Sequence, residues 1–212
     1  MTKRLFDIIV SILGLLFLSP LFLVVAILIA FESKGGIFYM QERIGFNEKP
    51  FYLFKFRSMC VNSDYKGLLT IGINDSRITK VGFFIRKYKV DELSQLINVF
   101  IGDMSLVGPR PEVRKYVENY SKFEKKVFKV KPGITDIASL IYFDENELLG
   151  QSEYPESFYK NSVLPQKLQL GILYIENYSF FLDFKLIAIT IIAIFNKKKS
   201  LFLINKMLNA IK

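Results

Sequence analysis

The sequence has 212 residues, 51% of them apolar, which is enough for one domain with a hydrophobic core. Its single cysteine, Cys60, excludes an internal disulfide, which suits a cytoplasmic domain. The sequence contains no histidine, which excludes a Ser-His-Asp triad and a His-ligated zinc site. Any catalysis must therefore use carboxylates, lysine, arginine, tyrosine, the backbone or an oxygen-liganded metal.

An uncharged run from Ile8 to Phe31 lies near the N-terminus. As a helix it would be about 36 Å long, against a hydrocarbon core of about 30 Å. It is too long for a signal peptide and no small-x-small cleavage pattern follows, so we expect it to stay in the mature protein and lie in a membrane. Ser19 and Pro20 lie in its middle, where proline should kink a helix. Basic residues flank both ends and favour placing both in the cytoplasm, so these residues alone support re-entry only slightly more than spanning.

Residues 37–59 predict two short strands joined by a turn at 45–48. In the second strand Lys55 and Arg57 alternate with aromatic residues, so we expect both cations on one face of the strand. The polar, glycine-containing residues 62–76 predict a loop.

Residues 77–87 predict a short helix or turn, and an amphipathic helix should follow from about Asp91 to near Ile101-Gly102. Pro111 could open the next helix, with Glu112 on its polar face. Residues 136–165 look mostly irregular, and a further helix should follow Pro165.

The uncharged residues 186–196 are too few to span a membrane. Lysines flank the segment on both sides, which is typical of a helix lying at the membrane interface. A buried core helix followed by a solvated basic tail fits the same pattern equally well, and the sequence leaves both alternatives open.

Two adjacent acids, Asp91 and Glu92, begin the amphipathic helix. The structural interpretation is a helix cap, because aspartate is a leading N-cap residue and acids in a first turn interact favourably with the helix dipole. The functional interpretation is phosphate chemistry, with Asp91 as a nucleophile and Glu92 as a ligand of Mg²⁺. Arg86 and Arg110 could clamp phosphate oxygens, although each arginine alone is more often a surface charge.

Four segments give the sequence a family resemblance: QERIGFNEKPFYLFKFRSM (41–59), DSRITKVGFFIRKYKVDELSQLINVFIGDMSLVGPRPE (75–112), KPGIT (131–135) and SFFLDFKL (179–186). They resemble the bacterial sugar transferases, the monotopic phosphoglycosyl transferases that start capsule, O-antigen and exopolysaccharide repeat units. The resemblance extends from Lys3 to about residue 195, and its long central block is highly specific.

The resemblance implies transfer of a sugar-1-phosphate from a UDP-sugar to polyprenyl (undecaprenyl) phosphate, with release of UMP and with Mg²⁺ as cofactor. The family's Asp-Glu dyad matches Asp91 as nucleophile, through a covalent aspartyl-phosphosugar intermediate, and Glu92 as metal ligand. The family's phosphate-binding basic residues match Lys55, Arg86 and Arg110. Arg57, on the same strand face as Lys55, is a further candidate for binding phosphate or nucleotide.

The resemblance also implies the architecture: an α+β fold with a re-entrant helix-break-helix at Ser19-Pro20 and a small, mostly helical catalytic domain with a short β-hairpin and interfacial amphipathic helices. The expected division is a membrane-embedded helix (1–34), a catalytic domain (35–200) and a basic, apolar C-terminal tail (201–212). The expected location is the bacterial inner membrane, among its lipids, with the catalytic domain facing the cytoplasm. A homodimer is compatible with this arrangement, and the sequence does not fix the oligomeric state.

The sequence departs from the common family pattern at four positions. Ser94 replaces a proline, Glu48 a turn glycine and Asp136 a glycine, while Gly171 stands where many members have an acid. We expect the departures at Asp136 and Gly171 to affect the sugar pocket, since that region should distinguish donors. The Asp-Glu dyad, Asp91 and Glu92, matches the common family pattern.

Two other classes of function compete with the transferase. A non-catalytic, membrane-anchored basic module of a polysaccharide assembly complex would use the apolar segments and the net charge of +9, but it needs no adjacent acids in a basic setting. A nucleic-acid binder would use the charge, yet it gives no role to the N-terminal segment, so we expect no nucleic-acid partner.

Overall fold

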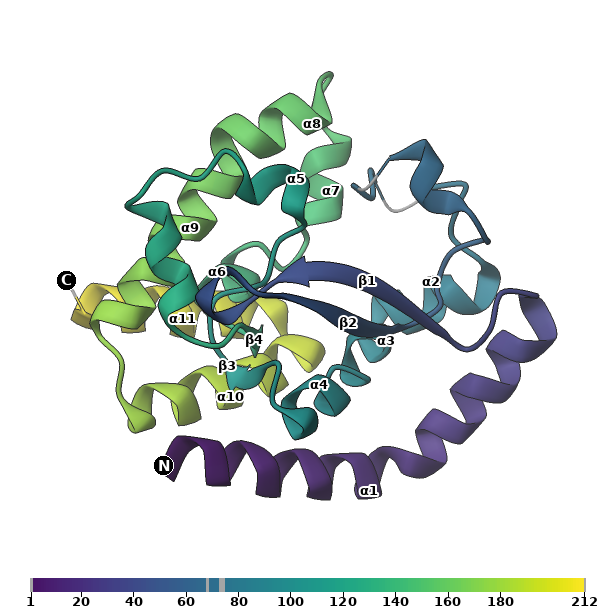
Figure 1. Ribbon diagram of the computed structural model, residues 1–212, viewed down its shortest axis with the longest axis horizontal. Coiled ribbons are helices and arrows are strands. Elements are labelled where there is room, and N and C mark those ends of the chain that lie inside the picture. The colour runs from purple at the N-terminus through teal and green to yellow at the C-terminus, as the bar shows by residue number, and fades with distance from the viewer. Residues whose placement is uncertain (1, 68, 73–74, 212) are drawn as a thin grey trace.

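The computed structural model describes residues 2–67, 69–72 and 75–211, and it mixes helices with two small sheets (Figure 1). Positions 68, 73 and 74 of the expected loop, and residues 1 and 212 of the expected terminal segments, lie outside the described residues. The strands are β1 (Phe38–Ile44), β2 (Pro50–Phe56), β3 (Ser105–Val107) and β4 (Gly133–Thr135). The helices are α1 (Thr2–Glu32), α2 (Lys80–Lys87), α3 (Val90–Leu93), α4 (Leu96–Ile101), α5 (Arg114–Val117), α6 (Ile137–Ile141), α7 (Glu145–Gly150), α8 (Pro155–Phe158), α9 (Leu164–Glu176), α10 (Phe180–Phe195) and α11 (Lys197–Ile211).

Strands β1 and β2 form the expected antiparallel hairpin, with Phe38 opposite Phe56 and Ile44 opposite Pro50. Its turn is a short 3-10 segment in which Asn47 and Glu48 have positive φ angles of 56° and 58°. Glycine adopts this left-handed backbone without strain, whereas other residues lose about 1–2 kcal/mol there. The usual family glycine at position 48 therefore has a physical reason, and Glu48 strains the turn.

Strands β3 and β4 form a short parallel pair, with Ser105 opposite Gly133 and Val107 opposite Thr135. The sequence patterns did not predict this pair, because three residues are too few to show strand periodicity. The pair matters for function because the turn that carries Arg110 leaves directly from the end of β3.

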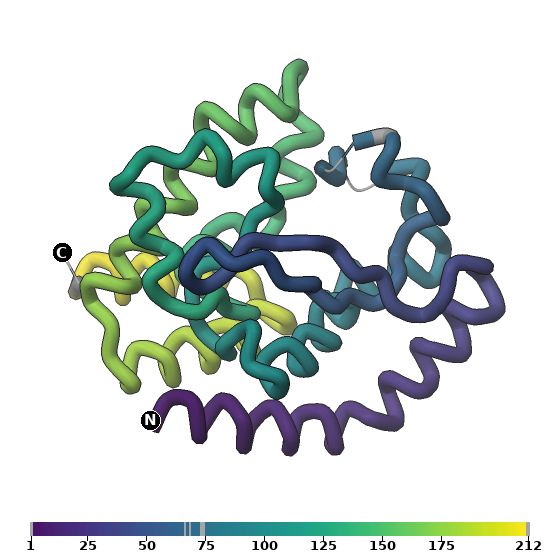
Figure 2. Tube along the Cα trace, viewed as in Figure 1, coloured from purple at the N-terminus to yellow at the C-terminus, as the bar shows by residue number. Residues whose placement is uncertain are grey.

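The N-terminal segment is one bent helix, α1, and not the two helices expected on either side of Ser19-Pro20; Figures 1 and 2 show the bend along its length. Proline at position 20 cannot donate to the carbonyl of Leu16, four residues earlier. The Ser19 hydroxyl donates to that carbonyl instead (2.8 Å), so the helix continues through the proline. Helix α1 is long and apolar enough to cross a membrane, and most of its central apolar window is exposed.

Both ends of α1 contact the same folded domain. Near the start, Arg4 donates to two carbonyls at the end of α4 (2.5 and 2.8 Å), and Asp7 accepts from the Leu106 amide (3.1 Å). At the end, the Glu32 carboxylate accepts from the first two backbone amides of α2 (2.8 and 2.9 Å). The helix is therefore an integral part of the fold.

The second half of α1 also forms a small hydrophobic cluster with the domain. Val25 and Ile29 are buried against Phe56 of β2, Ile85 of α2 and Val90 of α3. Fully burying a side chain of this size contributes about 1.5–3 kcal/mol. This cluster fixes the position of α1 relative to the three elements it contacts.

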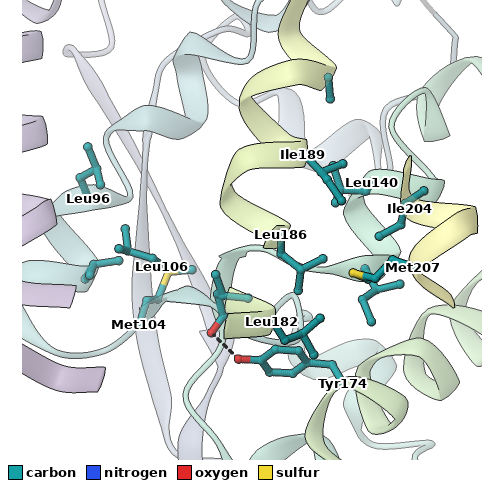
Figure 3. Close-up of a cluster of buried hydrophobic side chains, with 14 of the residues drawn as sticks. Leu96, Met104, Leu106, Leu140, Tyr174, Leu182, Leu186, Ile189, Ile204 and Met207 are labelled. Carbon is teal, nitrogen blue, oxygen red and sulfur yellow. Dashed lines mark hydrogen bonds between the residues drawn. The ribbon is translucent and has the colours of Figure 1, made fainter. Parts of the chain in front are cut away.

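The largest core cluster lies around α10 and α11 (Figure 3). Helix α10 buries Leu186 and Ile189 in this core, while Ile191, Ile194 and Phe195 on its other face are exposed. Residues 186–196 therefore combine the two alternatives of the sequence analysis: one face is a core helix, and the other is available to an interface. Helix α11 packs on α6 and α10, so residues 201–211 belong to the folded domain and do not extend from it as a tail.

Two expectations about the middle of the chain are wrong. Helix α5 begins at Arg114 and not at Pro111, so Glu112 precedes the helix and is buried. Residues 136–165 are mostly helical, as α6, α7, α8 and a π-helical segment from Tyr159 to Val163. Helices α6 and α7 are shorter than two helical turns, which is too short for their apolar spacing to reveal a helix, whereas α8 and the π-helical segment continue without a break into α9.

Candidate active site

All six candidate residues of the catalytic domain line one cavity of about 330 Å³. The hairpin contributes Lys55, the residue after it Arg57, helix α2 Arg86, helix α3 Asp91 and Glu92, and the turn after β3 Arg110. The sequence therefore identified residues that the fold brings together. Ser19 and Pro20 are in α1, outside this cavity.

Asp91 lies in the four-residue helix α3 and is only 5% exposed. The helix starts at Val90, one residue earlier than expected, and its N-cap is Lys89 in a left-handed conformation (φ 56°). Asp91 is thus inside the first turn and is not the N-cap. Its Oδ1 atom is buried and has no hydrogen-bonding partner among the described residues. A buried oxygen without a hydrogen bond lowers the stability of a fold by about 1–3 kcal/mol, so this oxygen of Asp91 destabilises the protein.

Glu92, the next residue, is held by two cations. Arg110 contacts both carboxylate oxygens, with Nη1 3.2 Å from Oε2 and Nη2 on Oε1, and Lys55 Nζ lies 3.0 Å from Oε1. Burial alone would raise the pKa of Glu92, but Arg110 and Lys55 outweigh burial and hold that pKa well below its ordinary value. Glu92 is therefore ionised at neutral pH.

The electrostatics of Asp91 differ from the sequence-based expectation. The helix N-terminus was expected to favour the ionised carboxylate, but burial and the neighbouring Glu92 raise the pKa of Asp91. Lys55, Arg86 and Lys89 act in the opposite direction and offset part of this rise. A four-residue helix without a capping bond from Asp91 supplies too little dipole to outweigh burial.

The two remaining arginines are oriented differently. Arg86 donates to the hydroxyls of Thr70 (2.9 Å) and Ser58 (3.4 Å), which are neutral partners, and within the described residues it forms no direct ion pair. Arg57 donates to the carbonyls of Gly36 (2.8 Å) and Phe38 (3.3 Å), so its guanidinium also stabilises the base of the hairpin. Arg86 is consequently the better placed of the two for a phosphate.

The departures at Asp136 and Gly171 both lie behind the turn that carries Arg110. The Asp136 carboxylate caps α6 by accepting from Ser139 N (2.6 Å) and also accepts from the backbone amide of Arg110 (3.3 Å). A Cβ atom added at Gly171 would lie 3.2 Å from Cβ of Pro109, so a larger residue there would press on the same turn. These positions therefore support Arg110 and contact the cavity only indirectly.

A second group of polar side chains in the cavity wall was not predicted from the sequence: Arg43, Glu112, Glu145, Tyr159 and Lys167, here named the Lys167 cluster. Tyr159 donates to Glu112 Oε1 (2.5 Å), and Lys167 Nζ donates to Glu145 Oε2 (2.8 Å). Arg43 Nη1 lies 3.3 Å from Glu112 Oε2. The position of Glu112 directly after the Pro-Arg-Pro turn was the one available sequence signal.

The dyad offers the oxygen donors that Mg²⁺ prefers, since this ion is usually held by one or two carboxylates together with substrate phosphates and water. Asp91 Oδ1 has no hydrogen-bonding partner in the described chain, and Glu92 Oε2 has a single donor there, Arg110 Nη1. Among the described residues, no group of three or more Cys, Asp or Glu side chains could hold a metal. The dyad thus fits a metal that is completed by substrate oxygens.

Comparisons with known proteins agree with the motifs. Residues 1–197 match the family described as bacterial sugar transferase. The chain is 38% identical, over 93% of its length, to UDP-glucose:undecaprenyl-phosphate glucose-1-phosphate transferase of Klebsiella pneumoniae, and it covers 41% of that protein. It is 36% identical, over 89% of its length, to UDP-N-acetylgalactosamine-undecaprenyl-phosphate N-acetylgalactosaminephosphotransferase of Aeromonas hydrophila, and it covers 42% of that protein.

A shorter relative has nearly the same extent as this chain. The chain is 38% identical, over 89% of its length, to the uncharacterized sugar transferase EpsL of Bacillus subtilis (strain 168), and it covers 85% of EpsL. The chain therefore spans less than half the length of the first two relatives, but most of the third. Because the family match covers nearly the whole chain, the protein belongs to the bacterial sugar transferase family.

Proposed function

We propose that the protein transfers a sugar-1-phosphate from a UDP-sugar to undecaprenyl phosphate, releasing UMP, as the first step of a bacterial polysaccharide. The observation that carries this proposal is the buried Asp91 carboxylate, whose Oδ1 has no hydrogen-bonding partner among the described residues, in a cavity wall that also holds Lys55, Arg86 and Arg110. A membrane-anchored binding module would gain nothing from such a costly buried acid.

The proposed reaction has two displacements at one phosphorus atom. A carboxylate oxygen of Asp91 attacks the phosphorus bonded to the sugar, and the bond from that phosphorus to the bridging oxygen breaks, so UMP leaves with the electron pair. A phosphate oxygen of undecaprenyl phosphate then attacks the same phosphorus and displaces the Asp91 carboxylate. The product is undecaprenyl diphosphate sugar, and Asp91 is regenerated.

The cations of the cavity have separate roles in this scheme. Arg86 binds the diphosphate, because its guanidinium has neutral partners and its charge is free to be paired. Arg110 and Lys55 hold Glu92 in place, and Arg110 is itself fixed in a turn between two prolines. Asp91 and Glu92 would hold Mg²⁺ when it is bound, and the ion would neutralise charge on the diphosphate.

The covalent step is tested by incubating the full-length protein with UDP-glucose and Mg²⁺ in the absence of acceptor. We expect the peptide that contains Asp91 to gain the mass of one sugar phosphate, with one UMP released per protein. Asp91→Asn should give neither signal. If UMP release always requires undecaprenyl phosphate and no modified peptide forms, the covalent scheme is wrong.

We also propose that α1 is re-entrant, with both ends on the cytoplasmic face of the inner membrane. Support comes from the contacts of Arg4, Asp7 and Glu32, which attach both ends of α1 to one folded domain. A helix that spanned the bilayer would place its ends on opposite sides, and one of them would lose these contacts.

Cysteine labelling tests this topology. Single cysteines at positions 2 and 35, placed in a Cys60→Ser background because Cys60 is exposed, should both be labelled only from the cytoplasmic side. Labelling of either position from outside intact cells would refute re-entry.

A further inference from the structure

The Lys167 cluster lines the same cavity as the dyad, and the proposed phosphate chemistry gives it no role. Its five members come from β1, the segment before α5, α7, the π-helical segment and α9. Five separate parts of the chain therefore converge on one wall of the cavity.

The cluster is buried as well as polar. Glu112 is 7% exposed, Lys167 8% and Tyr159 2%. Lys167 Nζ lies 2.8 Å from Glu145, 3.4 Å from the Tyr159 hydroxyl and 3.7 Å from Glu112. Glu112 is in turn held by Tyr159 and Arg43, so the ammonium group of Lys167 has a fixed position in the cavity wall.

Charge divides the cavity into two parts. The Lys167 cluster contains two acids and two cations, and so has no net charge. The rest of the described lining has an excess of positive charge. It contains six cations and three acids: Lys55, Arg57, Arg77, Arg86, Lys89 and Arg110 with Asp64, Asp91 and Glu92. The cationic part suits a diphosphate, whereas the balanced part suits a neutral ligand with many hydrogen-bonding groups.

Stability alone does not explain the cluster. Buried ion pairs are often replaced by apolar residues of similar volume without loss of stability, or with a gain. Tyr159 also begins a one-turn π-helical segment, and such segments are frequent at functional sites because they re-aim side chains. Both features point to recognition of a ligand in the cavity.

We propose that the Lys167 cluster binds the hydroxyl groups of the donor's sugar, with Glu145 and Lys167 in direct contact and Arg43, Glu112 and Tyr159 positioning Lys167. The proposal rests on the proposed function, because the sugar is bonded to the phosphorus that Asp91 attacks and must share its cavity. Glu145 is suited to the contact: its side chain is 24% exposed, and in the described chain Oε1 accepts no hydrogen bond while Oε2 accepts from Lys167. A carboxylate oxygen accepts hydroxyl hydrogens well.

The test measures binding, so that it does not depend on turnover. Full-length protein with Asp91→Asn is titrated calorimetrically, with Mg²⁺, against UDP-glucose, UDP-galactose, UDP-N-acetylgalactosamine and sugar-free UDP. Adding Glu145→Gln should lower the affinity for the most tightly bound UDP-sugar roughly ten- to hundredfold, which is the range expected for the loss of a hydrogen bond to a charged group. The affinity for UDP should change less than twofold.

Glu147→Gln is the matched control, because Glu147 lies on the same helix, is exposed and is absent from the cavity lining. An equal loss for UDP and the UDP-sugars would assign the cluster to the nucleotide and overturn the proposal. The proposal would also be overturned if the Glu145→Gln protein bound the UDP-sugars with the same affinities as the Glu147→Gln control. If Glu145→Gln fails to fold, Glu145→Asp decides the question, since its shorter reach should also weaken only the sugar-dependent part of the affinity.

Turnover by the unmodified protein is measured separately with the same donors. Absence of UMP release with all of them would refute the transferase proposal, while the titrations would still decide whether the cluster recognises a sugar.

Discussion

Asp91→Asn and Glu92→Gln should change stability in opposite directions, although the two residues are neighbours and both substitutions preserve shape. Burial and the neighbouring Glu92 raise the pKa of Asp91, so a neutral amide of the same shape removes a charge penalty on the order of 1 kcal/mol, although the polar atom at Oδ1 keeps no partner among the described residues. Glu92 is paired with Arg110 and Lys55, and removing one partner from a buried pair costs about 3–5 kcal/mol. Because the Glu92 side chain is 18% exposed, we expect the lower end, about 3 kcal/mol.

The pH dependence of the two effects follows from the pKa shifts. Glu92 has a folded-state pKa below 4.5, so its ion pairs stabilise the protein above pH 4.5, and this stabilisation is lost as the pH falls through the folded-state pKa. Asp91 has a folded-state pKa above 3.8, so its ionised form destabilises the fold at neutral pH; the penalty shrinks as the pH falls below that raised pKa and is gone below pH 3.8. The stability changes caused by Asp91→Asn and by Glu92→Gln should therefore both be largest at neutral pH and become smaller in acid.

Thermal unfolding of the full-length protein in detergent micelles measures the prediction. For a chain of this size, 1 kcal/mol shifts Tm by roughly 2–4 °C, so Asp91→Asn should raise Tm by several degrees and Glu92→Gln should lower it by roughly 6–12 °C. Both variants should lose UMP release by several orders of magnitude. A lower Tm in Asp91→Asn would mean that the cations around Asp91 stabilise its charge more than burial destabilises it, and would refute this reasoning.

Three further substitutions have distinct expected outcomes. Glu48→Gly should raise stability by about 0.5–1 kcal/mol in thermal unfolding, because it relieves the positive φ and removes only an exposed ion pair with Lys125; a lower Tm would contradict this reasoning. Arg86→Ala should lower kcat/KM by a factor of about 10²–10³, whereas Arg57→Ala should lower it less than tenfold because Arg57 is bonded to hairpin carbonyls. Equal losses in the two variants would contradict the assignment of Arg86 to the diphosphate. Pro20→Ala should favour a straight, spanning α1. The domain that follows residue 35 would stay on the cytoplasmic face, so a cysteine at position 2 should become accessible from outside intact cells; unchanged labelling would show that the bend does not depend on proline.

Patterns that repeat within a few residues predicted the structure well. The alternation along β2 located the hairpin and placed Lys55 in the cavity wall, and Gly102 marked the end of α4 with its positive φ of 102°. The position of Asp91 and Glu92 beside arginines also followed from the sequence, because the turn and helix that carry them are close along the chain.

Features that depend on distant contacts could not be predicted. Arg43, Glu112 and Lys167 each look like an ordinary surface charge along the chain, and only the packing of β1, the Pro-Arg-Pro turn and α9 buries them together. The raised pKa of Asp91 has the same origin, since its burial comes from the tertiary fold and overrides the local effect of the helix N-terminus.

In the proposed topology, the hydrophobic cluster between α1 and the domain would couple the bilayer to the reaction. Phe56, Ile85 and Val90, which pack on Val25 and Ile29, are the immediate chain neighbours of Lys55, Arg86 and Asp91. Any change of bilayer thickness that alters the bend of α1 must therefore displace the backbone next to these three side chains. Lipid composition should for this reason act on turnover itself as well as on the amount of protein bound to the membrane, and a domain excised without α1 would lose the packing of Val25 and Ile29 on these neighbours.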